Sequence, residues 1–291
     1  MSIDQEKYKF KIGQFNCTIF RDLLFKYQAK DFFINANQED LKQAINKYHI
    51  VPDNIPSPFI AVLLQEGNKN ILIDTGMGFS EEAILFRGNK IPQKGKLNQL
   101  LQEEGIKNDE ITDVIITHFH PDHIGGIFLS KNELNFPNAQ FHIHEKEWNH
   151  WHSSKSDNEL PLFKFFVEKN ITPLSKQHLN LIKGDFIEII PGIQCVKAGG
   201  HTPGQMAVII KQETNSLMYI SDAFLHPLHI ENIDWQTNYD LDHKKAKKTR
   251  IKLLELAYKE HMIINAFHFD FPGLGRIDKL KNKWVWNYTE K

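Results

Sequence analysis

The chain has 291 residues with a formal net charge of −1, and 41% of them are hydrophobic against 24% charged. This is an ordinary globular mix, and a chain of this length can bury a sizeable core without disulfides. A nucleic-acid or anionic-membrane partner would favour a basic face, so we expect neither. No apolar stretch is long enough to span a bilayer, and the N-terminal residues lack a secretory signal, which favours the cytoplasm.

The first half of the chain predicts alternating strands and helices. In chain order the pattern indicates a strand at 15–19, a helix at 41–48 capped by Asn37, a hairpin of 59–64 and 70–73 around Gly67, a helix at 97–104 ended by Gly105, and a buried strand at 114–116. The last of these strands leads directly into His118.

The second half repeats this alternation. It predicts a strand at 141–143, a Trp-rich helix from Glu145, two strands within 187–196 separated by Pro191-Gly192, a hairpin of 205–210 and 217–220 around Thr214-Asn215, a helix from about His243 to His261, and a last short strand at 263–264. The alternation favours a single α/β domain over 1–291, with an N-terminal extension at about 1–55 and a terminal tail at about 272–291. Cys17 and Cys195 lie in alternating apolar stretches, and we expect two buried thiols.

Four potential metal ligands fall within the segment His118-Phe119-His120-Pro121-Asp122-His123. In an extended chain His118 and His120 point the same way, whereas the adjacent Asp122 and His123 diverge and can address a second point close by. That geometry suits two metal ions a few Å apart. Imidazole and carboxylate ligands without a thiolate favour zinc and leave iron, manganese and cobalt open.

This segment resembles the His-x-His-x-Asp-His signature of the metallo-β-lactamase superfamily. Further similarity over 59–271 comes, in chain order, from Asp74-Thr75-Gly76, Gly200-His201-Thr202-Pro203-Gly204, Ser221-Asp222 and His268. The resemblance implies a four-layer αββα sandwich. It also implies one metal held by His118, His120 and His201, a second held by Asp122, His123 and His268, and Asp222 as the bridge between them.

The implied activity is hydrolysis by a hydroxide that bridges the two metals, with Asp122 both binding metal and orienting that hydroxide. Asp222 stands where β-lactamases usually carry another residue, so antibiotic hydrolysis is not expected. The segments 221–227 and 269–276 resemble the branch of methyl-parathion-hydrolase-like enzymes and N-acyl homoserine lactone lactonases. A quorum-quenching lactonase is favoured, acting on a small molecule with an acyl or aryl tail, and a homodimer is compatible with the sequence.

The sequence leaves alternatives open. Within the family these are a phosphotriester hydrolase and a thioesterase of the glyoxalase II kind; from another class they are a redox di-iron protein or a non-catalytic binding module. Apolar residues flanking the ligands predict a substrate lining made of Phe119, Phe224, Phe267 and Phe269.

Some lactonases of this superfamily use a tyrosine shortly after the bridging aspartate, and this chain has none there. We hypothesise that His226 replaces it as a hydrogen-bond donor, with His229 as the alternative; simple packing of His226 before Pro227 is equally compatible with the sequence.

Two other groups of polar residues are interpreted as structural rather than functional. His142, His144, His150 and His152 form a loose cluster, for which polar packing is favoured over a third metal. The basic run from Lys244 to Arg250 is interpreted as the solvated face of a helix.

Overall fold

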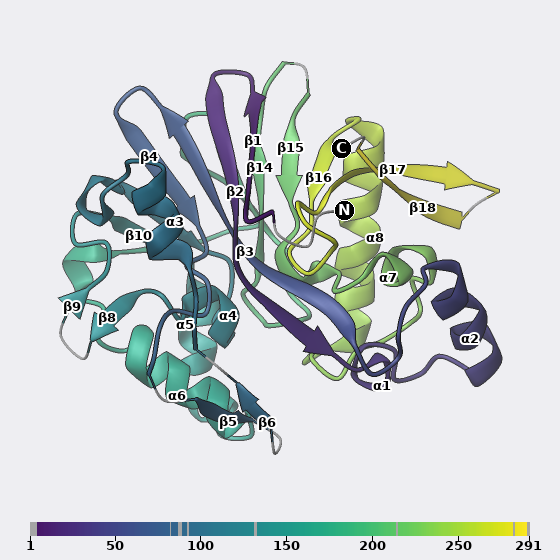
Figure 1. Ribbon diagram of the computed structural model, residues 1–291. Coiled ribbons are helices and arrows are strands. Elements are labelled where there is room, and N and C mark those ends of the chain that lie inside the picture. The colour runs from purple at the N-terminus through teal and green to yellow at the C-terminus, as the bar shows by residue number, and fades with distance from the viewer. Residues whose placement is uncertain are drawn as a thin grey trace. The chain divides into compact units, whose positions relative to one another are not determined.

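The computed structural model describes residues 5–81, 83–86, 89–91, 93–130, 133–213, 215–281 and 283–289 (Figure 1). The chain divides into two compact units: the first comprises residues 1–23 and 59–187, and the second comprises 24–58 and 188–291. None of the described helices is long and apolar enough to cross a membrane.

The larger strands of the first half form a seven-stranded sheet in the order β1-β2-β3-β4-β7-β10-β11. These strands are β1 (Lys7–Ile12), β2 (Phe15–Tyr27), β3 (Ile55–Glu66), β4 (Lys69–Ile73), β7 (Asp113–Ile116), β10 (Gln140–His144) and β11 (Leu179–Ile182). Two small hairpins lie outside this sheet, β5 (Ile84–Phe86) with β6 (Asn89–Ile91) and β8 (Phe128–Ser130) with β9 (Glu133–Leu134).

Strands β4, β7, β10 and β11 are parallel to one another, and all four residues of β7 are buried. Continuous apolar runs such as Val114-Ile115-Ile116 are typical of parallel strands covered on both faces. Parallel neighbours end at the same edge of a sheet, and Ile73 of β4 pairs with Ile115 of β7. The turn after β4 and the histidine-rich loop after β7 therefore meet at one edge.

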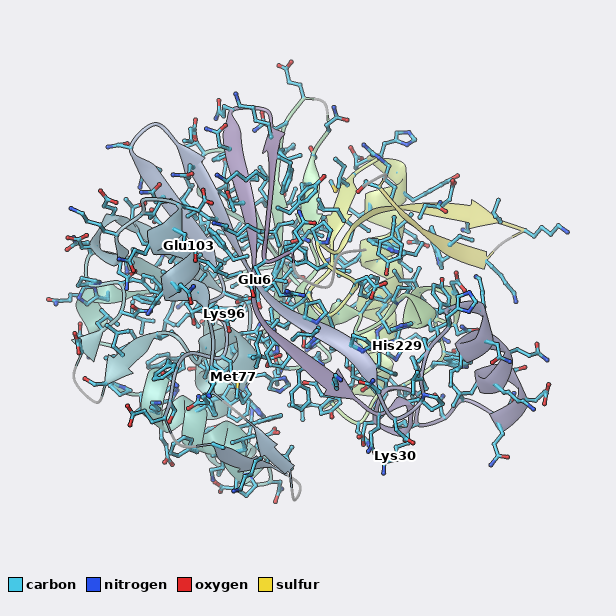
Figure 2. The ribbon with its side chains drawn as sticks, viewed as in Figure 1. Glu6, Lys30, Met77, Lys96, Glu103 and His229 are labelled. Carbon is cyan, nitrogen blue, oxygen red and sulfur yellow. The ribbon has the colours of Figure 1, made fainter. Side chains whose placement is uncertain are left out.

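The described residues of the first unit form four short α-helices, α3 (Leu97–Glu103), α4 (Pro121–Ile124), α5 (Glu145–Trp151) and α6 (Pro161–Asn170), with 3₁₀ turns at Asn108–Glu110, Ser154–Ser156 and Lys176–His178. On the unit's surface Lys96, at the start of α3, contacts Glu6, and Lys7 of β1 contacts Glu103 (Figure 2). Exposed ion pairs of this kind contribute little to stability, so the helix depends on its buried face.

A buried carboxylate fastens the turn that precedes the histidine-rich loop. Asp22 of β2 accepts hydrogen bonds from the backbone N–H groups of Met77 (2.8 Å) and Leu97 (2.9 Å). Burial raises the pKa of Asp22 to about 6, although these amide donors favour its charged form. Gly76 has φ +69°, and a Cβ there would lie 2.4 Å from the Asp22 carboxyl carbon. A glycine is required at this position by both conformation and space.

The second seven-stranded sheet has the order β12-β13-β14-β15-β16-β17-β18. Its strands are β12 (Phe186–Ile190), β13 (Ile193–Lys197), β14 (Met206–Ile210), β15 (Leu217–Tyr219), β16 (Ile263–Asn265), β17 (Leu274–Leu280) and β18 (Lys283–Tyr288). The second unit also holds α1 (Ala29–Phe32), α2 (Gln38–Lys47), the 3₁₀ turn Ser221–Ala223, α7 (Pro227–Glu231) and α8 (His243–Lys259). Helix α8 packs on β17 and on the 3₁₀ turn (Figure 1).

Most predicted elements are confirmed, with boundaries shifted by a few residues. Asn37 caps α2 by accepting the backbone N–H of Asp40 at 2.8 Å, and both cysteines are free and buried. The hairpin of β14 and β15 is also confirmed, although Thr214 of its turn lies outside the described residues. The prediction of one domain over 1–291 stays a prediction.

The expectation that 263–264 is the last strand is wrong. Residues 274–280 and 283–288 of the expected tail form the paired strands β17 and β18, and Trp284 and Trp286 are buried in the core of the second unit. The basic run is also partly misinterpreted, because Arg250 is 1% exposed and points into the protein.

Candidate metal centre

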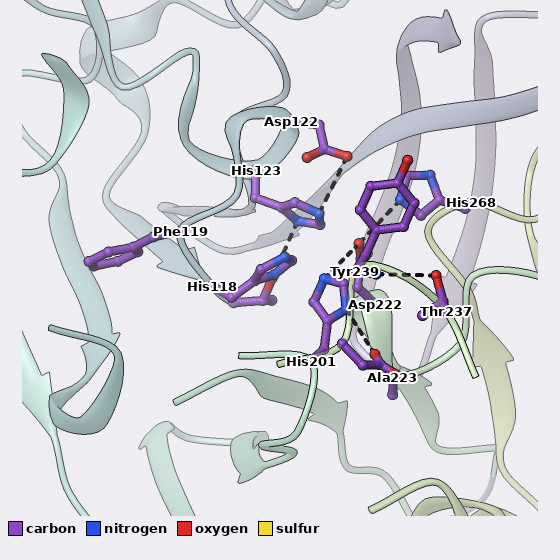
Figure 3. A network of polar contacts seen from close by, with 12 residues as sticks. His118, Phe119, Asp122, His123, His201, Asp222, Ala223, Thr237, Tyr239 and His268 are labelled. Carbon is purple, nitrogen blue, oxygen red and sulfur yellow. Dashed lines mark hydrogen bonds and ion pairs between the residues drawn. The ribbon is translucent and has the colours of Figure 1, made fainter. Parts of the chain in front are cut away.

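The loop after β7 carries four of the predicted ligands, all of them buried: His118, His120, Asp122 and His123. Pro121 occupies the first turn of α4, where its missing N–H costs no hydrogen bond. The ring centroid of His118 lies 4.6 Å from that of His120. It lies 4.0 Å from that of His123, which is beside it in Figure 3. Three imidazoles and a carboxylate are thus gathered in a buried environment. Such a cluster costs free energy unless an interaction such as metal binding compensates it.

Asp74 orients His123. It follows β4 at φ +59°, and its Oδ2 lies 2.8 Å from His123 Nδ1. The other oxygen accepts the backbone N–H of Thr117 at 2.8 Å, and the Thr117 hydroxyl donates to the same carboxylate. An ionised Asp74 needs a proton on Nδ1, so Nε2 of His123 carries the lone pair. Carboxylate–histidine pairs of this kind are usual behind metal-bound imidazoles.

Glu147 of α5 holds the same loop from another side. Its Oε1 accepts the backbone N–H of Phe119 at 3.1 Å and the indole N–H of Trp151 at 2.9 Å. The ring of Phe163 from α6 lies 4.4 Å from that of His120. The loop is therefore fixed by the two helices that follow it in sequence, and its histidine rotamers are restricted.

The remaining predicted ligands belong to the second unit, where His201 follows β13, Asp222 lies in the 3₁₀ turn after β15, and His268 follows β16. All three are buried. Asp222 Oδ2 lies 3.2 Å from His268 Nε2 and 3.5 Å from His201 Nε2 (Figure 3). One carboxylate oxygen is thus close to both imidazoles, the arrangement expected of a bridging ligand.

Asp240 holds His201 as Asp74 holds His123, and no local sequence pattern marks Asp240. Its Oδ1 lies 3.1 Å from His201 Nδ1, and its Oδ2 accepts from Arg250 at 2.7 Å. Burial alone would raise the pKa of Asp240, but the Arg250 charge and the histidine hydrogen bonds outweigh it and hold that pKa well below its usual range. His201 therefore also presents Nε2 as its lone-pair atom.

The donor set fits divalent metal ions. Six of the seven predicted ligands are candidate metal ligands: His118, His120, Asp122 and His123 in the first unit, and His201 and Asp222 in the second. His268 is placed beside Asp222. Nitrogen and oxygen donors without thiolate suit zinc and its first-row neighbours.

An aromatic wall of Tyr27, Phe32, Tyr239 and Phe267 lies beside His268, and of these residues the sequence predicted Phe267 alone. The rings of Tyr27 and Phe32 lie 5.6 and 6.4 Å from it, and Tyr239 lies 5.5 Å from Tyr27. Tyr27 and Phe32 come from the predicted N-terminal extension, and Phe267 lies 4.7 Å from His268. No local motif marks Tyr27, Phe32 and Tyr239, because their sequence positions are far from His268.

The other predicted substrate residues are placed in the core. Phe119 is fully buried and points away from His118 and His123 (Figure 3). Phe224 and Phe269 belong to the apolar core of the second unit. Phe267 differs from these residues, because its ring packs edge-on against that of His268. For Phe119, Phe224 and Phe269 the placement favours packing over substrate contact, and their substrate role stays a prediction.

His226 and His229 are buried at α7. His226 Nδ1 accepts the backbone N–H of Leu228 at 3.1 Å, and His229 Nε2 donates to the carbonyl of Phe32 at 2.7 Å. Burial lowers the pKa of each to about 3, so both are neutral at physiological pH. The catalytic role of His226 stays a prediction.

The four histidines of the loose cluster have separate protein partners. His142 contacts Asp113, His144 the carbonyl of Gly184, His150 Glu159, and His152 the ring of Trp148. Burial would raise the pKa of Asp113, but hydrogen bonds from His142, Thr112 and Lys69 lower it to about 2. Among the described residues they form no group of candidate metal ligands, in line with polar packing.

Comparison with known proteins identifies the family. The sequence profile of the metallo-beta-lactamase superfamily matches residues 61–264, more than half of the chain. The chain therefore belongs to the metallo-β-lactamase superfamily and is a hydrolase of that superfamily.

Particular relatives narrow the comparison. An N-acyl homoserine lactonase of Bacillus cereus is 25% identical over 249 residues, covering 81% of this chain and 91% of its own. Two solved structures are similar over 98% of both chains. Hydrolase AbOPH of the beta lactamase superfamily has a TM-score of 0.85 and 25% identity; AidC, a dizinc quorum-quenching lactonase in complex with a product, has 0.83 and 24%. The predicted α/β fold of the metallo-β-lactamase type is confirmed.

Proposed function

We propose that this protein is a dinuclear metal-dependent lactonase that opens N-acyl homoserine lactones. The observation that carries the proposal is the likeness to the Bacillus cereus lactonase, which extends over most of both chains. AidC, which is similar in fold over almost the whole chain, is a lactonase with two zinc ions. Quorum quenching is the role that such an activity would serve.

The proposed ligand assignment follows the superfamily signature. One metal is assigned to His118, His120 and His201, the other to Asp122, His123 and His268, and Asp222 bridges them. The hydrogen bonds of Asp74 and Asp240 support it, because they leave Nε2 of His123 and His201 as the donor atoms. When bound, two divalent cations, zinc in first place, supply an activated water and a Lewis acid for the ester carbonyl.

The chain's own residues hold and select the substrate. Tyr27, Phe32 and Phe267 place apolar surface beside His268, which suits an acyl tail. Each methylene buried there contributes about 0.8 kcal/mol of binding. Glu147 and Asp74 restrain the histidine loop, so that its side chains need little reorganisation when substrate binds.

A panel of three substrate classes tests the proposal. The metal-loaded protein is assayed with acyl homoserine lactones of increasing chain length, a nitrophenyl phosphotriester and a glutathione thioester. We expect kcat/KM to be highest for a lactone and to rise with chain length until steric limits appear.

Each competing function has its own outcome in this panel. A phosphotriester that is hydrolysed faster than every lactone would establish the runner-up activity, and a preferred thioester would establish the glyoxalase II kind. A protein that binds metal but turns over none of the three would contradict the lactonase and favour the redox or non-catalytic alternative.

A further inference from the structure

Arg250 of α8 is the largest fully buried side chain in the described part of the chain, with 1% of its surface exposed. Its neighbours Lys244 and Lys248 on the same helix are exposed. Burying a guanidinium without compensation would cost far more than a typical core contact returns, so its partners must repay that cost.

The guanidinium contacts three separate segments of the second unit. Nε donates to the carbonyl oxygen of Ala223 at 2.7 Å, Nη1 to that of Trp235 at 3.2 Å, and Nη2 to Asp240 Oδ2 at 2.7 Å. The face of Phe224 lies 5.8 Å away. A planar group with fixed donor directions can hold three acceptors in one geometry, which a lysine ammonium on a flexible stem cannot reproduce.

Two of these contacts are close to predicted metal ligands. Asp240 Oδ1 accepts a hydrogen bond from His201 Nδ1, and Ala223 directly follows Asp222 in the 3₁₀ turn. Arg250 thus connects the carboxylate that orients His201 with the backbone that carries Asp222. In the first unit Thr117 holds Asp74 in the corresponding way, with a hydroxyl and a backbone N–H.

We propose that Arg250 is a positioning residue for the metal centre, which sets the relative geometry of His201 and Asp222 through Asp240 and the Ala223 carbonyl. The inference rests on the proposed metal-dependent function. It differs from a purely structural ion pair in one respect: a structural pair would affect folding, whereas a positioning residue also sets how tightly the folded protein binds metal.

The test measures Zn²⁺ affinity by competition with a chromogenic chelator, alongside the melting temperature of the metal-free protein. The variants are Arg250→Met, which removes the charge, and Arg250→Lys, which keeps it. Lys248→Met is the matched control, because it removes one positive charge from the exposed side of the same helix. We expect both Arg250 variants to lose about 10- to 100-fold in Zn²⁺ affinity and Lys248→Met to keep the wild-type value.

Asp240→Asn extends the test should Arg250→Met fail to fold. It removes the negative charge with little change in shape, and we expect a loss of Zn²⁺ affinity in the same direction. If Arg250 acts through Asp240, the double variant Arg250→Lys/Asp240→Asn loses less affinity than the two single losses multiplied together. Nitrogen-15 spectra of labelled histidine add a second readout, because wild-type His201 should show the Nδ1–H tautomer and Asp240→Asn should not preserve it.

The outcomes separate this inference from the function on which it rests. Wild-type protein that binds no divalent metal contradicts the proposed metal centre itself. Wild-type protein that binds Zn²⁺, together with Arg250 variants that melt earlier yet bind Zn²⁺ equally well, shows a structural ion pair and overturns the positioning role.

Discussion

His226 illustrates how burial changes what an imidazole can do. The sequence suggested a side chain that titrates near neutrality, but burial lowers its pKa to about 3. Because Nδ1 accepts the Leu228 N–H, the proton resides on Nε2 and the ring stays neutral between pH 5 and 8. His226 can therefore donate a hydrogen bond through Nε2, but it cannot act as an acid that titrates in that range.

The variant His226→Phe tests the donor role. We expect it to keep its metals and to lose about 100-fold in kcat on lactones, the usual loss for one oxyanion donor. Steady-state kinetics with metal analysis is the measurement. Loss of the α7 cap should separately cost about 1 kcal/mol of stability, so His226→Asn, which can still cap the helix, serves as control. Wild-type turnover in the Phe variant would leave His226 with a capping role alone.

The predicted metal ligands can be recognised in the sequence, whereas the carboxylates that orient them cannot. His118, His120, Asp122 and His123 share one loop, so their spacing alone predicted a metal site. The carboxylates behind them are distant: Asp74 is 49 positions from His123, and Asp240 is 39 from His201. Such pairs are created by the tertiary fold, and no local pattern encodes them.

Among the elements, the turn after β4 depends on glycine for two reasons that can be separated. Gly67, in the β3–β4 hairpin, and Gly76 have similar conformations, with φ +57° and +69°. A Cβ at Gly67 would meet nothing within 4 Å, whereas at Gly76 it would clash with the Asp22 carboxyl.

We expect Gly67→Ala to cost about 1 kcal/mol, the conformational penalty alone, and Gly76→Ala to cost clearly more. Urea unfolding of both variants measures the difference. The same chemical change is made at both positions, so backbone strain is matched. Equal losses would show that the packing of Asp22 against this turn contributes nothing to stability.

The predictions from the sequence pattern were wrong at helix α8 and at the last hairpin. The basic run hid a buried stripe in which Ala246, Arg250, Leu254 and Ala257 recur at helical spacing. That periodicity was available in the sequence and could have placed Arg250 inside. In β18 the alternation of Trp284 and Trp286 is a strand signal, but charged residues around the short turn made the segment resemble a tail. Its role emerged only from packing against the core of the second unit.

For the whole molecule, bound metal should act as a folding ligand. We expect close to two equivalents of divalent metal per chain, and a higher melting temperature for the loaded protein than for the chelated one. For each site, metal at a hundredfold excess over its dissociation constant adds about 2.7 kcal/mol, which corresponds to roughly 5 to 10 °C per site for a chain of this size.

Calorimetry before and after chelation, with metal content measured on the same samples, checks this expectation. Readdition of Zn²⁺ after chelation should restore the melting temperature, which controls for damage by the chelator. If saturating Zn²⁺ does not change the melting temperature and less than one equivalent is bound, a dinuclear centre is ruled out.

The points at which the chain passes from one unit to the other determine which residues stay together when the gene is divided there. The chain changes unit after residues 23, 58 and 187, and each change falls within a strand: β2, β3 and β12. A gene fragment that starts at codon 188 therefore encodes His201, Asp222 and His268 but lacks Tyr27 and Phe32, the rings beside His268. Recombination at that boundary would combine His201, Asp222 and His268 from one parent with Tyr27 and Phe32 from the other.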